Sequence, residues 1–152
     1  HERGIALQGC FVFGLDGEGP GVFERTADFA VEVGIDLPRF AILTPFPGTP
    51  LFRRLEGEGR ILTRDWELYD GQHVVFRPLG MTVEELSRGT ERAWRRAYGW
   101  TSMLRRLRRT AAPLHVALLT NLGYRHYARN LHRFYTCDAM LGRRPASVDP
   151  AA

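Results

Sequence analysis

The sequence predicts an α/β protein in which the strands of a parallel sheet alternate with helices and are followed by a helical extension. Three observations support this prediction. Residues 5–14 alternate between large apolar and small or polar side chains, and residues 40–44 form a short, nearly continuous apolar run. Helical spacing of apolar residues separates the two runs and returns after the second one. Strand, helix, strand, helix is the order typical of a parallel sheet with right-handed crossovers.

The first predicted strand has two different faces. One face carries the large apolar side chains of Ile5, Leu7, Phe11 and Phe13. The other carries the smaller or more polar Ala6, Gln8, Cys10, Val12 and Gly14, which suits the crowded interior of a barrel that also holds a ligand.

The next elements follow from spacing and capping residues. Residues 22–33 are expected to form a helix, and residues 40–44 a strand covered on both faces. Thr49 can cap and Pro50 can open a second helix that Gly59 ends.

Beyond this unit the pattern loosens and then becomes helical. Residues 61–81 read as a loop with a brief strand at 73–76, which would form a lid or an edge. Thr82 and Glu85 form a capping box that starts a long helix, in which Gly89 and Gly99 are candidate bends. A further helix is expected to open at Pro113, with an apolar face that the sequence places on Leu114, Ala117, Leu118, Leu122, Ala128, Leu131 and Phe134.

Composition excludes several classes of protein. The 152 residues are 44% hydrophobic and 25% charged, as in ordinary globular chains, and no apolar stretch reaches the length of a membrane span. All 21 basic residues are arginine. Residues 1–86 hold 8 Arg against 14 acids, a net charge of −6, whereas residues 87–152 hold 13 Arg against 3 acids, a net charge of +10. A solvated helical face explains the basic part most simply, and the alternative is a peripheral membrane- or polyanion-binding module at residues 87–109.

The cysteines and histidines do not predict a metal site. Cys10 and Cys137 lie 127 positions apart, and no Cys-x-x-Cys motif is present. His126 and His132 are six apart, which places them on different faces of a helix. We therefore expect both histidines to be surface or packing residues.

Several motifs in one order resemble a known family. They are Cys10 to Glu18 after the first strand, Ile42 to Leu51 with its Pro-Gly-Thr-Pro turn, Glu58-Gly59-Arg60, Asp65-Trp66, Tyr69 to Pro78 and Met81 to Leu86. Together they resemble the C-terminal stretch of the radical SAM enzymes that also carry a cobalamin-binding domain. The resemblance covers about residues 4 to 110.

The resemblance implies the C-terminal portion of a partial (β/α) TIM-like barrel, with the order β-α-β-α, followed by a helical extension. It also implies a 4Fe–4S cluster held by three cysteines spaced Cys-x-x-x-Cys-x-x-Cys, a triplet this sequence lacks. The cluster ligands and any cobalamin domain would therefore precede His1. The chain is expected to be part of an S-adenosylmethionine-dependent methyltransferase or oxidoreductase, catalytically incomplete alone, with no catalytic residue of its own.

The resemblance also implies candidate binding residues. Those that match the family's SAM adenosine contacts are Cys10, Val12, Gly14, Leu43, Thr44 and Pro45. Gln8, on the same strand face, is a further candidate for a polar contact to SAM or substrate. Tyr69, Gln72 and His73 in the connecting segment are expected to reach substrate, although a packed edge explains them equally well. Two positions depart from the family pattern: Cys10 replaces a common glycine, and Glu18 falls one residue late. Gly14 and Gly48 have the simpler alternative of shaping turns.

The expected organisation is a barrel part at residues 1–60, a connecting loop or edge strand at 61–81, a helical extension at 82–145 and a disordered tail at 146–152. The expected partners are the N-terminal portion of the same protein and a small molecule, lipid-like or tetrapyrrole. A cytoplasmic location is expected, with peripheral membrane contact as an alternative, and nucleic acid is disfavoured because no reading motif accompanies the arginines.

Overall fold

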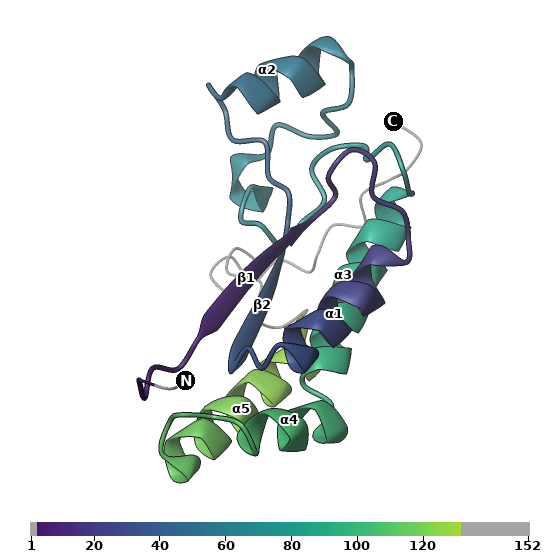
Figure 1. The fold of residues 1–152 in the computed structure, drawn as a ribbon. Coiled ribbons are helices and arrows are strands. Elements are labelled where there is room, and N and C mark those ends of the chain that lie inside the picture. Colours follow the sequence, from purple (N-terminus) through teal and green to yellow (C-terminus); the bar gives the residue numbers. More distant parts are fainter. Residues whose placement is uncertain (1–2, 132–152) are drawn as a thin grey trace.

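The computed structural model describes residues 3–131, in which a two-stranded sheet and five α-helices make an α/β fold (Figure 1). The predicted α/β class is confirmed. The elements, in chain order, are β1 (Gln8–Phe13), α1 (Val22–Glu32), β2 (Leu37–Ile42), α2 (Pro50–Gly57), the 3₁₀ turn η1 (Trp66–Leu68), α3 (Val83–Ala97), α4 (Trp100–Leu107) and α5 (Leu114–Arg129).

The two strands pair in parallel, in a register that runs from Gln8 opposite Leu37 to Phe13 opposite Ile42. The pairing continues past the strand end, where the Leu43 N–H donates to the Phe13 carbonyl at 2.8 Å. The predicted strand boundaries were partly wrong. Ile5 lies before β1 and is exposed, because none of the described residues packs over this start of the chain.

One face of the sheet is covered by α1 and α3, which lie side by side across it (Figure 1). Phe13 and Phe40 point into this layer and stack with their ring centroids 5.7 Å apart. The indole of Trp94 on α3 packs edge-on against Phe40 and donates to the Phe40 carbonyl at 3.0 Å. Burying these aromatic side chains supplies the main apolar stabilisation of the fold.

The contact between α1 and α3 depends on a glycine. A Cβ at Gly89 would lie only 2.2 Å from the ring of Phe23, so the two helices approach at a distance that no larger residue allows. The predicted bend at Gly89 is wrong, because α3 continues through it from Val83 to Ala97. The glycine serves close packing and not a change of direction.

The capping predictions are confirmed. The Thr49 hydroxyl accepts from the Phe52 N–H at 3.2 Å, with Pro50 in the first turn of α2. Thr82 and Glu85 form both hydrogen bonds of a capping box at the start of α3.

The connecting segment is less regular than predicted. No strand forms at 73–76 among the residues that the structure describes; a single antiparallel bridge joins Ile61 to Phe76 instead. Tyr69 and Val75 are buried here with Phe52 of α2, in a small second core.

The long helix predicted after Thr82 is broken. It ends at Ala97, and α4 restarts after Gly99, which confirms the predicted bend at that glycine. α5 begins after Pro113 as predicted, yet its buried face uses Ala117, Asn121 and Ala128, while Leu114, Leu118 and Leu122 are exposed. Phe134 and the predicted tail lie outside the described residues.

Candidate functional site

The carboxyl end of β1 is shaped by Gly14 and Glu18. Gly14 has a φ of +98°, and a Cβ there would lie 3.0 Å from Leu86 and 3.1 Å from Phe76. The Glu18 carboxylate accepts from the backbone N–H groups of Gly14 (2.8 Å) and Leu15 (3.0 Å). Within the described residues, the close approach that Gly14 permits is therefore to the core, and Glu18 closes the turn despite its late position in the motif.

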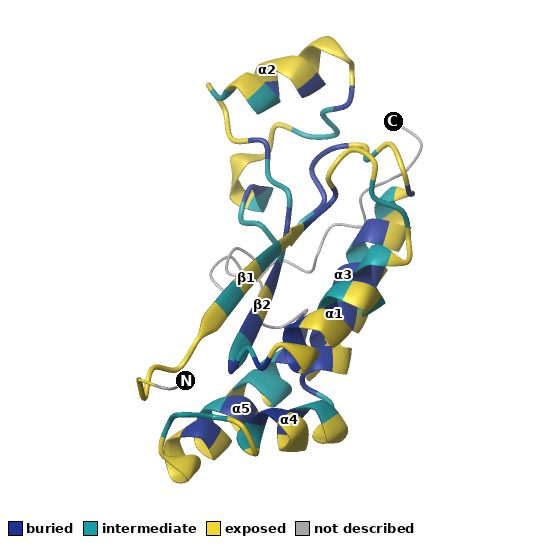
Figure 2. Cartoon of the chain, viewed as in Figure 1, coloured by how far each residue is buried: buried dark blue, intermediate teal, exposed yellow. Residues whose placement is uncertain are grey.

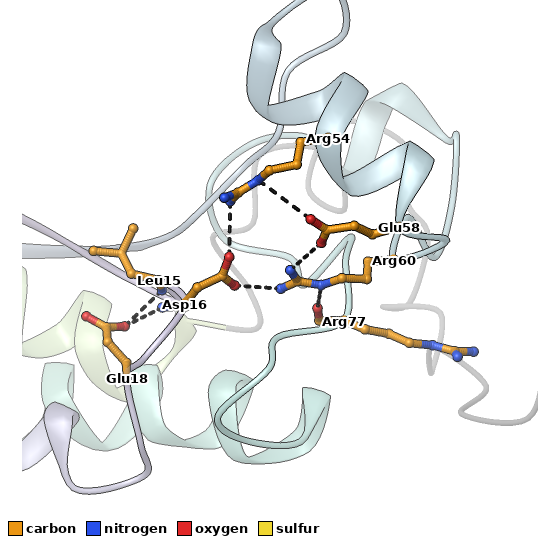
Figure 3. A network of polar contacts seen from close by, with 8 residues as sticks. Leu15, Asp16, Glu18, Arg54, Glu58, Arg60 and Arg77 are labelled. Carbon is orange, nitrogen blue, oxygen red and sulfur yellow. Dashed lines mark hydrogen bonds and ion pairs between the residues drawn. The ribbon is translucent and has the colours of Figure 1, made fainter.

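An ionic network fixes the loop that follows this turn (Figure 3). The Arg60 guanidinium, only 8% exposed, donates to Asp16 (2.8 Å), to Glu58 (2.8 Å) and to the Arg77 carbonyl (2.7 Å). Arg54 of α2 reaches the other oxygen of Asp16 at 3.1 Å. Three segments distant in sequence are thus joined beside the end of β1.

The network shifts the titration of its members. The hydrogen bond from Arg60, helped by the charges of Arg60 and Arg54, outweighs desolvation and lowers the pKa of Asp16. The hydrogen bond that Arg60 donates to Asp16 correspondingly raises the pKa of Arg60. Both groups therefore stay charged at neutral pH, and Asp16 is held as a fixed anion.

The second face of the sheet carries the candidate cofactor residues of β1. Gln8, Cys10 and Val12 alternate along it, all exposed, with Val12 44% accessible. The amide of Gln8 lies 3.6 Å from the Cys10 sulfur. The register places the exposed Arg39 of β2 opposite Cys10, a cation that sequence reasoning did not single out. Arg39 lies between the apolar Pro38 and Phe40, and this alternation could have predicted an exposed arginine on the second face.

The candidate residues after β2 lie at the same end of the sheet. Leu43 and Thr44 are half-buried and Pro45 is buried. The Thr44 hydroxyl donates to the Ile42 carbonyl at 3.1 Å, so it turns back on its own strand. The pairing at Leu43 brings this segment beside the end of β1, as predicted.

The three candidate substrate residues fall in two different environments. Tyr69 is buried, its hydroxyl donates to the Thr63 carbonyl at 2.7 Å, and burial raises its pKa. His73 and Gln72 instead surround Asp70, whose carboxylate accepts from His73 Nδ1 (3.1 Å), the Gln72 N–H (2.8 Å) and the His73 N–H (3.2 Å). Tyr69 is thus placed as a core residue, whereas Gln72 and His73 form a polar cluster.

The polar cluster lies beside the second strand. The Gly71 carbonyl accepts from the Ile42 N–H at 2.7 Å, which holds this segment along the outer edge of β2 near its carboxyl end. Burial would raise the pKa of Asp70, but the hydrogen bonds from His73 and from the backbone outweigh it and lower this pKa. Sequence reasoning missed Asp70, although its position before Gly71 is typical of an Asx turn.

The arginines of residues 87–109 are mostly engaged within the fold. Arg92 pairs with Glu24 at 3.0 Å, and Arg96 forms two hydrogen bonds with Asp28 at 2.5 and 2.8 Å. Arg106 is buried. The α3 part of this segment therefore forms ion pairs with α1 and does not present a free cationic face.

The remaining sequence candidates carry no site in the described residues. No group of three or more His, Cys, Asp or Glu side chains there could hold a metal ion, so residues 3–131 do not fit the ligand set of an iron–sulfur cluster. No helix within that range has the length and apolarity needed to cross a membrane. His126 is exposed, as expected for a surface residue, and His132 and Cys137 lie outside the described residues.

The fold and this geometry define a class: an α/β unit whose paired parallel strands end at a polar, loop-lined edge, the usual position of ligand sites in such sheets. Comparison with known proteins then shows which family and which relatives the chain resembles. Residues 49–122 match a domain family described as a domain of unknown function, DUF4070.

Three curated relatives extend the match. The chain is 33% identical over 131 residues to bacteriochlorophyllide d C-12(1)-methyltransferase of Chlorobaculum tepidum, which covers 86% of this chain and 28% of the relative. It is 27% identical over 139 residues to the C-8(2)-methyltransferase of the same organism (88% and 30%). It is 31% identical over 97 residues to anaerobic magnesium-protoporphyrin IX monomethyl ester cyclase of Cereibacter sphaeroides (64% and 16%).

These matches confirm the resemblance to the C-terminal part of radical SAM enzymes that the motifs predicted. The chain spans less than a third of the length of these relatives. The relatives are methyltransferases and a cyclase, so the chain corresponds to part of a larger enzyme.

Proposed function

We propose that this chain supplies the last strands of a partial radical SAM barrel and helps to bind the adenosine of SAM at their carboxyl ends. The observation that carries the proposal is the parallel pairing of β1 with β2, which brings Val12 and Leu43 to one end of the sheet. The opposite sheet face is covered by helices, while Val12 stays 44% exposed. One face of the sheet is therefore covered and the other is open at Val12, as expected of a strand that lines a ligand site.

The chain's own residues would act by contact and by positioning. Val12 and Leu43 would offer apolar contact to the adenine. Gln8 and Cys10 would line the same face nearer the amino end of β1. Thr44, Pro45 and Gly14 would set the backbone at the strand ends. The network around Arg60 would hold the Asp16 loop against α2, so that the strand ends keep one geometry.

The cofactors implied are SAM and a 4Fe–4S cluster, with cobalamin as a further candidate for this subgroup. When bound, the cluster would supply the electron that cleaves SAM reductively, or SAM and cobalamin would supply the methyl group. The cluster ligands would come from the preceding part of the protein. The proposed division is a barrel part at residues 1–60, a connector at 61–81 and a helical extension from 82.

The substrate class we propose is a tetrapyrrole, because three relatives are named for chlorophyll-type tetrapyrrole substrates. The polar cluster of Asp70, Gln72 and His73 would face it at the edge of β2. Methyl transfer is the reaction named for two of these relatives and ring formation for the third.

A chimera tests the proposal. This chain would replace the matching 131 residues of the C-12(1)-methyltransferase. We expect the chimera, with its cluster reconstituted under anaerobic conditions, to bind SAM and cleave it, and the isolated chain to do neither. A folded chimera with a full cluster and no SAM binding would refute the proposal, as would SAM cleavage by the chain alone.

A further inference from the structure

We infer that the α4–α5 hairpin, residues 100–129, is a docking surface for an anionic lipid membrane. The first observation is a concentration of uncovered apolar side chains. Figure 2 shows exposed residues on both helices, at the end of the molecule opposite α2. The large apolar side chains exposed here include Trp100, Leu104, Leu114, Leu118, Leu119 and Leu122.

These side chains are exposed because the inner face of the hairpin is filled by other residues. Arg106, with 2% of its surface accessible, donates to the Ala97 carbonyl and, at 2.8 Å, to the Asn121 side chain. Ala117 and Asn121 of α5 are buried against this junction. The hairpin is therefore fixed to α3, and its leucines have no other described surface to pack on.

The second observation is charge. Residues 100–131 contain six arginines and no Asp or Glu. On α3, by contrast, Arg92 and Arg96 are matched by acids of α1. Arg105 on α4 and Arg108 just after it are exposed, and the Arg125 guanidinium lies 4.3 Å from the centre of the Trp100 ring. The hairpin carries no acid of its own, and the nearest acids, Asp28 and Glu32 of α1, lie beside Arg105. A surface that joins arginine to tryptophan and leucine is complementary to anionic headgroups over an apolar interior.

The mixture of side chains favours lipid over nucleic acid. Arginines alone would suit a phosphate backbone, but exposed leucines gain nothing from phosphates and offer no stacking surface for bases. α5 has 16 residues and α4 has 8, so the hairpin would lie in the interface without crossing it.

The position of the hairpin keeps the candidate site free. Arg109 donates to the carbonyl of Glu32 at 2.9 Å, at the end of α1 that precedes β2. The hairpin thus lies at the amino ends of the strands, away from the carboxyl ends (Figure 1). Membrane docking would leave those ends accessible, and the inference stands apart from the proposed chemistry.

Vesicle sedimentation tests the inference with the 152-residue chain and needs neither SAM nor cluster. We expect binding to vesicles of phosphatidylcholine mixed with phosphatidylglycerol, weakened by high salt, and little binding to phosphatidylcholine alone. The double variant Leu119→Gln with Arg105→Gln should bind about tenfold more weakly or worse. The matched control is Leu79→Gln with Arg64→Gln, because both of these side chains are 68% exposed and lie outside the hairpin.

Equal weakening by the two double variants would overturn the inference, and so would absence of binding to anionic vesicles or binding to RNA in their place. Tryptophan quenching by brominated lipid gives an independent measurement without altering the hairpin. In a Trp66→Phe background the remaining tryptophans are the buried Trp94 and the exposed Trp100. We expect brominated anionic vesicles to quench Trp100, and unchanged fluorescence would also contradict docking.

Discussion

The two faces of the small sheet are built for different purposes. The face toward α1 and α3 carries Phe13 and Phe40, both almost fully buried. The other face carries Gln8, Cys10 and Val12, and the described residues leave all three exposed. Each strand contributes side chains to both faces in alternation, and α1 and α3 cover only one of them. The covered face holds the fold together, and the uncovered face is available to a ligand or to further strands.

Truncating one side chain on each face measures how much each face stabilises the fold. Phe40→Ala should lower the free energy of unfolding by about 3–5 kcal/mol, because Phe40 packs against Phe13 and Trp94. Val12→Ala should cost less than about 1 kcal/mol, because Val12 is already partly in water. Urea denaturation measures both, and similar costs would mean that the two faces are equally packed.

A second test adds atoms to the covered side. Gly89→Ala should destabilise by about 1–3 kcal/mol although alanine favours helices, because its Cβ would collide with Phe23. Gly123→Ala in α5 is the control, since nothing lies within 4 Å of its Cβ position, and it should stabilise by about 0.5–1 kcal/mol. Stabilisation by both substitutions would show that α1 and α3 are not in close contact.

A third test concerns the ionic network of Arg60 beside the carboxyl end of β1. Arg60→Met should cost about 1–2 kcal/mol, because it leaves Asp16 and Glu58 without their common partner, both of them partly solvated. The exposed Arg64 pairs with Glu56 at 2.7 Å, and Arg64→Met should cost less than about 0.5 kcal/mol. Faster hydrogen exchange at Gly14 and Leu15 in Arg60→Met alone would show that the network holds the loop.

The smallest effect concerns acidity. The pKa of Asp70 is below its ordinary value of 3.8, so the unfolded chain binds a proton first as the pH falls. The stabilisation from Asp70 is therefore complete above pH 3.8 and is lost as the pH falls further, toward its folded pKa. Asp70→Asn should flatten this acid limb in equilibrium unfolding, and an unchanged slope would show that Asp70 is not held by His73.

Local patterns were sufficient to predict most elements. The period of residues 22–33, the caps at Thr49 and Thr82 and the break at Gly99 all rest on neighbours in sequence, and each is confirmed. The predicted strand at 73–76 is wrong because a strand needs a pairing partner along its length. In this segment only Phe76 forms a bridge, with Ile61. The predicted face of α5 is confirmed at Ala117, Ala128 and Leu131 and wrong at Leu114, Leu118 and Leu122, because the buried Arg106 donates to Asn121 on the inner face.

The site could be predicted only in part, for the same reason. The motifs predicted the strand ends. Asp16 and Arg60, however, are 44 residues apart, and no local sequence pattern predicts their ion pair. Tyr69 was expected either to reach substrate or to pack at an edge, and its buried hydroxyl, which donates to the Thr63 carbonyl, fits the packed alternative. The roles of the remaining candidate residues stay predictions.

The most direct test of the central claim is SAM affinity after the uncovered face is blocked. In the chimera with the C-12(1)-methyltransferase, Val12→Trp would fill the space at the carboxyl end of β1, and Leu79→Trp would add the same bulk at an exposed site outside the sheet. We predict a loss of SAM affinity of about tenfold or more for Val12→Trp alone, with cluster content unchanged. Unchanged affinity with a tryptophan at position 12 would contradict the account.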